Sequence, residues 1–144
     1  MSMAEKQCEC DATSILVFPC SGGSNVGQIA NAAGIELFRR GKVNFYCLAG
    51  MGAHVAGMVD SAQHADYRIA IDGCPVACAR KTLEQASVPV EKAVVITQLG
   101  IVKDHEMVWT YDELDLVVAA ALEDVPVVAD KEGGCGCGCG GDSK

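Results

Sequence analysis

The sequence predicts an α/β domain of three layers, in which a mostly parallel sheet of four to five strands is covered by helices on both faces. Two observations lead to this fold class. Short apolar runs rich in β-branched residues alternate along the chain with longer helix-like stretches, which is typical of parallel sheets. The chain has 144 residues and half of them are apolar, so it is long and apolar enough for one compact domain.

The first strand–helix unit is predicted near the N-terminus. Residues 14–18 form a partly β-branched apolar run that stops at Pro19, and this pattern predicts a buried strand. A loop rich in Gly and Ser follows. Residues 26–40 are predicted as a helix, because Ser24 or Asn25 can accept hydrogen bonds from the free N–H groups of its first turn.

Further strand–helix units follow in order. The predicted strands are 43–47, 67–71 and 93–97, with a short edge strand at 125–128. The predicted helices are 53–65, a helix opened by Pro75 that runs to residue 86, and 112–122. Residues 98–109 fit either a loop or a short strand. Repeated strand–helix alternation predicts a Rossmann-like or flavodoxin-like arrangement.

The sequence divides into three parts. We place the folded domain at residues 13–129. Residues 1–12 form an N-terminal arm that carries Cys8 and Cys10, and residues 130–144 form a flexible tail of Gly and Cys that lacks the apolar residues needed for a core.

Composition excludes several functional classes. A formal net charge of −8 argues against binding to nucleic acid or to an anionic membrane surface. The longest uncharged run, residues 12–35, is broken by proline and glycines, so we expect no membrane span. No signal peptide is visible, and we expect a cytoplasmic protein. In a reducing compartment, nine cysteines indicate metal or thiol chemistry rather than disulfides.

Three of these cysteines occupy equivalent places. Cys20 and Cys47 close the first two predicted strands and Cys74 follows the third, and successive members are 27 residues apart, about one strand–helix unit. All three are therefore expected at the carboxyl edge of the sheet, where open α/β sheets bind ligands. Cys78 lies four residues after Cys74, so both are expected on one side of the first turn of the helix opened by Pro75.

Four thiolates are the donor set of a closed tetrahedral zinc site. The helices predicted after these cysteines would direct their N-termini toward the site and offset its negative charge. Because the set leaves no open coordination position and has no base beside it, it favours a binding protein for metal storage, delivery or sensing over an enzyme. The metal ion is the partner expected, and the sequence identifies no protein partner.

The motif Asp72-Gly73-Cys74, with Cys78 four residues on and two cysteines upstream, resembles the DGC domain family. The resemblance covers roughly residues 13–125. It implies a zinc-binding protein, and the four cysteines of the family match Cys20, Cys47, Cys74 and Cys78.

Other uses of the cysteines remain open. Helix N-terminal thiols also suit a redox or sulfur-transfer protein, for example one in which Cys74 and Cys78 cycle between dithiol and disulfide. Four thiolates also suit an iron–sulfur cluster. In the tail, alternation of cysteine and glycine predicts secondary metal capture by Cys135, Cys137 and Cys139.

Overall fold

The computed structural model describes residues 13–126 and contains a four-stranded sheet in which every pairing is parallel. The strands lie in the order β2-β1-β3-β4, with bounds β1 Ile15–Pro19, β2 Asn44–Phe45, β3 Tyr67–Asp72 and β4 Lys92–Val95. The helices are α1 Asn25–Arg39, α2 Leu48–Gly52, α3 Ala56–Gln63, α4 Cys78–Gln85, the 3-10 turn η1 Ile96–Leu99 and α5 Tyr111–Leu122. The predicted α/β fold class is confirmed.

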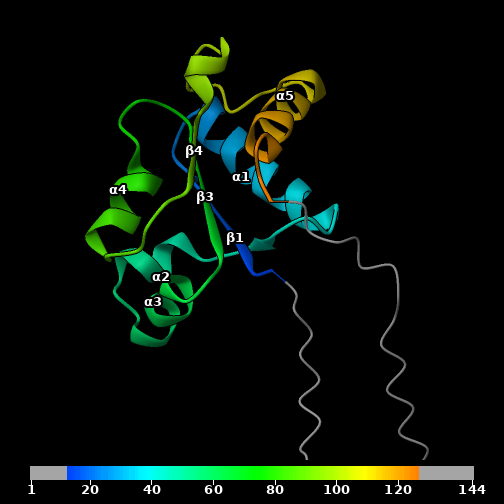
Figure 1. Ribbon diagram of the computed structural model, residues 1–144. Coiled ribbons are helices and arrows are strands. Elements are labelled where there is room, and N and C mark those ends of the chain that lie inside the picture. The colour runs from blue at the N-terminus through cyan, green and yellow to red at the C-terminus, as the bar shows by residue number, and fades with distance from the viewer. Residues whose placement is uncertain (1–12, 127–144) are drawn as a thin grey trace, which may run out of the picture.

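Helices cover both faces of the sheet, as Figure 1 shows, with α1 and α5 on one side and α2, α3 and α4 on the other. Alternate residues of β1 point to opposite faces because side chains alternate along a strand. Ile15 and Val17 pack with the α1 and α5 layer, whereas Leu16 and Phe18 pack with the α2–α4 layer. Both central strands are therefore buried on two faces, which explains their nearly continuous apolar sequence.

The strand order creates a switch point between β1 and β3. From β1 the chain crosses through α1 to β2 on one side, and it then returns over the other face through α2 and α3 to β3 on the opposite side of β1. The segments that leave β1 and β3 therefore diverge toward opposite faces. In open α/β sheets such a divergence leaves a crevice at the carboxyl ends of the strands, where ligands bind.

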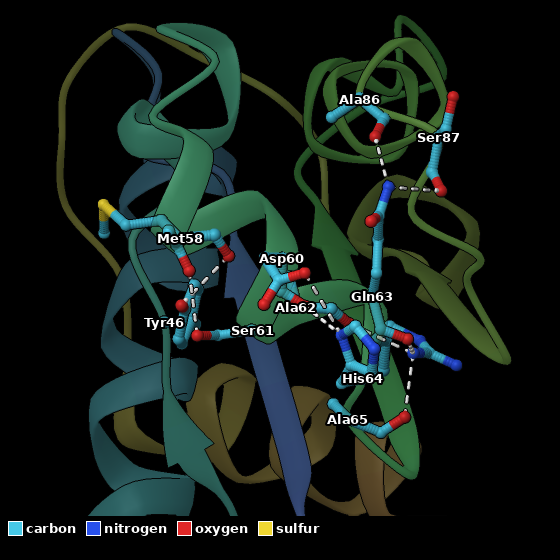
Figure 2. A network of polar contacts seen from close by, with 12 residues as sticks. Tyr46, Met58, Asp60, Ser61, Ala62, Gln63, His64, Ala65, Ala86 and Ser87 are labelled. Carbon is cyan, nitrogen blue, oxygen red and sulfur yellow. Dashed lines mark hydrogen bonds and ion pairs between the residues drawn. The ribbon is translucent and has the colours of Figure 1, made fainter.

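The end of α3 is fixed by Arg68, a buried charge on β3. Its guanidinium donates to three backbone carbonyls there, those of Ala62, Gln63 and Ala65. It also pairs with Glu91, which precedes β4, at 2.5 Å. The Gln63 side chain in turn reaches two carbonyls at the end of α4, those of Ala86 and Ser87, as Figure 2 shows. These contacts hold α3, α4 and the sheet together from the end opposite the crevice.

Several predicted boundaries were wrong. The helix expected over 53–65 is shorter, α3 at Ala56–Gln63, and the preceding helix α2 at Leu48–Gly52 was not expected. The two helices are separated where the chain turns at His54, which has a left-handed φ of 53°. The strand expected over 43–47 is limited to Asn44–Phe45, and the one over 93–97 ends at Val95 in a 3-10 turn. For residues 98–109, where a loop or a short strand was expected, the structure has the end of the 3-10 turn followed by an irregular loop over 101–110.

Some expectations fall on residues that are not described. The edge strand expected over 125–128 extends past residue 126, and residues 125 and 126 themselves are not in a strand. The arm 1–12, the tail 130–144 and their cysteines also lie outside the described residues. Within 13–126, none of the helices has the length and apolar character needed to cross a membrane.

Candidate metal centre

Three of the four predicted cysteine ligands line one pocket. This thiol pocket has a volume of about 240 Å³ and lies between the segments that follow β1 and β3. Its lining comprises Cys20, Gly22, Gly23, Ser24, Gly27, Asp72, Gly73, Cys74, Val76, Cys78 and Lys103. A larger hollow of about 470 Å³ lies between α1 and the start of α5, but no thiol lines it. The chemistry predicted from the cysteines therefore belongs to the smaller pocket at the switch point.

The fourth predicted ligand, Cys47, lies outside this lining. It is exposed and forms the N-cap of α2, where its Sγ accepts a hydrogen bond from the Gly50 N–H at 3.4 Å. In the part of the chain that is described, no three His, Cys, Asp or Glu side chains stand in a metal-coordinating cluster as they are placed. The four-cysteine ligand set therefore stays a prediction, with three members in one pocket and the fourth at the end of the neighbouring strand.

Asp72, the first residue of the Asp-Gly-Cys motif, fixes the start of α4. Only 2% of its surface is exposed, and its carboxylate accepts hydrogen bonds from the N–H groups of Ala79 at 2.7 Å and Arg80 at 3.1 Å. These donors belong to the first turn of α4, whose N-cap, Ala77, lacks a side-chain acceptor. Asp72 thus acts as the cap that the helix otherwise lacks, and it holds Cys78 at the pocket.

The helix predicted to open at Pro75 begins instead at Cys78. Residues 75 and 76 form a turn closed by a hydrogen bond from the Ala77 N–H to the Cys74 carbonyl at 3.0 Å, and Ala77 has a left-handed φ of 55°. The sequence spacing predicted that Cys74 and Cys78 lie on one helical turn, and this prediction was wrong. They flank a tight turn, and the turn still brings both residues to the same pocket.

Gly73, the second residue of the motif, allows β3 and α1 to approach closely. A Cβ atom on Gly73 would lie 2.9 Å from the backbone N of Gly27 and 2.9 Å from the carbonyl carbon of Val26. Real Cβ atoms do not approach backbone this closely, so a side chain would push the strand away from the helix. The glycine therefore keeps the Cys74 side of the pocket against the start of α1.

Burial dominates the electrostatics of Cys20. It raises the pKa of this thiol, and the negative charges of Asp72 and Cys78 act in the same direction. Backbone hydrogen bonds from Gly22 and Gly73 oppose the rise without cancelling it. Burial likewise raises the pKa of Asp72, against the N–H groups of Ala79 and Arg80. A raised thiol pKa is the opposite of what an activated nucleophile needs, and a nearby cation would favour the Cys20 thiolate.

Lys103 supplies a positive charge at the pocket, and the sequence did not predict it. Its Nζ lies 3.6 Å from Cys74 Sγ. The residue belongs to the covering loop, residues 101–110, which follows η1 and crosses the start of α1. The loop has neither helical nor strand periodicity, so nothing in the local pattern indicated that it folds back over the cysteines.

The pocket fits a thiophilic metal ion in its donor chemistry. The four cysteines within 13–126 are free thiols, and three of them come to the pocket from two separate segments. Thiolate sulfur favours zinc, Cu(I) and iron–sulfur clusters over hard cations such as magnesium or calcium. Gly22 lies beside Cys20, and a Cβ atom at this position would contact Cys20 Sγ at 3.5 Å.

Comparisons with known proteins agree with the sequence resemblance. A family model described as the DGC domain matches residues 16–121, about three quarters of the chain. A relative from Pseudomonas aeruginosa, the "Anaerobic and virulence modulator AnvM", is 34% identical over 90 residues, which cover 62% of this chain and 69% of the relative. No solved structure matches the chain.

Proposed function

This chain belongs to the DGC domain family, and from that premise we propose that it is a zinc-binding protein whose metal sits in the thiol pocket. The proposed ligands are Cys20, Cys74, Cys78 and, from the neighbouring strand end, Cys47. The observation that carries the proposal is the shared pocket. Cys20 and the Cys74–Cys78 turn are more than fifty residues apart in sequence, yet they line one cavity at the switch point of the sheet.

A metal ion also accounts for the electrostatics. Burial raises the pKa of Cys20, which favours the neutral form of this thiol. Bound zinc favours the thiolate form and offsets the cost of burying it. Cys47 would have to turn away from the Gly50 N–H to join the other three sulfurs, and its contribution is therefore tested separately.

The chemistry favours binding over catalysis. Four protein ligands close the zinc coordination sphere, which is the pattern of structural and regulatory sites rather than of catalytic ones. The described lining holds no histidine, and its carboxylate, Asp72, is committed to α4. Among storage, delivery and sensing we favour sensing, because the name of the Pseudomonas relative assigns that protein a modulating role.

The test is zinc content in a background free of the other cysteines. In the five-serine background, Cys8, Cys10, Cys135, Cys137 and Cys139 are all replaced by serine in the full-length chain. We expect about one zinc per chain, held by sulfur at about 2.3 Å. Cys20→Ser and Cys78→Ser should each weaken binding, and Cys47→Ser should do so if it is the fourth ligand. Absence of zinc, or binding unaffected by Cys20→Ser and Cys78→Ser, would contradict the proposal.

The alternatives predict different observations. An iron–sulfur protein purified without oxygen would be brown and would absorb visible light, whereas a zinc protein is colourless. A thiol redox protein would show reversible formation of a Cys74–Cys78 disulfide in the absence of metal. A zinc protein would instead show thiols that zinc protects from alkylation.

A further inference from the structure

The covering loop is fastened to the start of α1 on both sides of Lys103. The Asn25 side chain donates to the Val102 carbonyl at 2.8 Å and accepts from the Asp104 N–H at 2.7 Å. The Asn25 backbone N–H also donates to the Asp104 carbonyl at 3.0 Å. Asn25 itself is 3% exposed, and its two side-chain hydrogen bonds to the loop are partly buried. The backbone on either side of Lys103 is thus held by one buried residue.

A second contact fixes the loop further along. His105 Nδ1 lies 2.9 Å from the Gly23 carbonyl, and Gly23 itself lines the thiol pocket. The loop is therefore attached to the segment that carries Cys20, although Lys103 contacts Cys74 on the other side of the switch point. The backbone that carries Lys103 is therefore fixed beside the pocket, which keeps its side chain within reach of Cys74.

We infer that Lys103 is a positioning residue of the metal site, whose fixed positive charge stabilises the metal-bound thiolate of Cys74 and slows release of the ion. This inference rests on the proposed function. Binding one Zn²⁺ to four thiols releases four protons, so the charge of the site changes from zero to −2. A neighbouring ammonium favours the more negative state, and Lys103 is placed to donate a hydrogen bond to one of its sulfurs.

The other cations near the pocket are differently placed. Arg80 pairs with Glu84 at 2.9 Å along α4. Lys81 is exposed on the same helix. Burial raises the pKa of Asp72, and the positive charge of Lys81 only opposes that rise. Lys81 therefore serves as a control with the same charge and a similar neighbourhood. Lys103, in contrast, places its Nζ within hydrogen-bonding distance of Cys74 Sγ.

The experiment compares zinc affinity and zinc release in the five-serine background with Lys103→Met, Lys103→Arg and Lys81→Met. Affinity is measured by competition with a chromophoric chelator, and release by the rate of transfer to excess chelator. Loss of an outer partner of a metal ligand commonly weakens binding about 10- to 100-fold. Because Lys103 is exposed and partly screened by water, we expect about a tenfold loss for Lys103→Met.

Arginine should restore most of the affinity, and Lys81→Met should leave it unchanged. The effect of Lys103→Met should shrink as salt rises, because an exposed charge is screened. If the side chain had only a structural role, the effect of Lys103→Met on zinc affinity would not depend on salt, and Lys103→Arg would not restore the affinity. Unchanged affinity and release in Lys103→Met would overturn the inference while leaving the zinc site intact. A background chain that binds no zinc would overturn the proposed function itself, and the two failures are thus distinguishable.

Discussion

Replacing Asp72 by alanine should lower the free energy of unfolding, because one carboxylate accepts both hydrogen bonds that cap helix α4. The residue is buried, and it accepts hydrogen bonds from the N–H groups of Ala79 and Arg80. Because Ala77 provides no side-chain cap, the substitution leaves the first turn of α4 without its acceptor. Helix α4 also carries Cys78 at its first position, so the same change should weaken zinc binding.

The magnitude follows from the two donors. Ala79 is fully buried, and a buried amide left without an acceptor costs about 1–3 kcal/mol. Arg80 is exposed, and water can replace part of its lost hydrogen bond. Loss of a helix cap typically costs ~1 kcal/mol. The lost cap and the unpaired amide are the same broken hydrogen bonds, so we expect a loss of about 1–3 kcal/mol, which corresponds to a melting temperature lower by roughly 4–12 °C in a domain of this size.

The assay is urea unfolding followed by circular dichroism, with Asp66→Ala as the matched control. Asp66 also accepts one backbone hydrogen bond, from the Ser14 N–H at 2.7 Å, but it is exposed. We expect Asp66→Ala to change the free energy of unfolding by about 0.5 kcal/mol or less. If Asp72→Ala destabilises the protein no more than Asp66→Ala does, then Asp72 is not the cap of α4 and our interpretation of the motif is wrong.

Two further predictions concern packing and pH. Gly73→Ala should lower the free energy of unfolding by about 1–3 kcal/mol, because the new Cβ atom meets the Gly27 backbone. Gly57→Ala is the control, since Gly57 lies in open space on α3, and it should raise the free energy of unfolding by up to ~1 kcal/mol. Urea titrations of both variants measure the two changes. Burial alone would raise the pKa of Glu91, but the hydrogen bonds from Arg68 outweigh burial and lower it. A lowered pKa contributes stability that is present above the ordinary value of 4.5 and is lost as the pH falls through the folded value. Glu91→Gln should therefore be less stable than the wild type at neutral pH, and unfolding curves should show the gap closing in acid; a gap that widens in acid would contradict the sign.

The fold class followed from the sequence because its signals are local and strong. The apolar runs of β1 and β3 are buried on both faces, so their composition alone predicts strands. The sequence predicted Ser24 or Asn25 as the cap of α1. Ser24 is the cap, and its hydroxyl accepts a hydrogen bond from the Gly27 N–H at 3.2 Å. Helix α2 was not predicted, because its five residues, Leu48–Gly52, are too few to show a helical period. The turn that separates it from α3 is made by His54, a non-glycine residue with a positive φ, which the local sequence does not signal.

The sequence placed Cys20, Cys74 and Cys78 near one another, but it did not predict how they are arranged. The regular spacing of the cysteines along the chain predicted that Cys20 and Cys74 lie at the carboxyl ends of strands. The two strands, β1 and β3, are neighbours in the sheet, and both cysteines line one pocket. The cap formed by Cys47 and the turn before Cys78 depend on backbone hydrogen bonds that spacing does not encode. Lys103 was missed for a related reason. The backbone on either side of it is held by hydrogen bonds to Asn25, which is far away in sequence.

X-ray absorption spectroscopy of the five-serine background, combined with elemental analysis, examines the metal centre most directly. We predict about one zinc per chain in a first shell of sulfur, at the Zn–S distance of about 2.3 Å that thiolate ligands give. The signal should lose sulfur when Cys20 or Cys78 becomes serine. A chain that carries no metal, or a metal bound through oxygen and nitrogen alone, would show that these thiols share a pocket without sharing an ion.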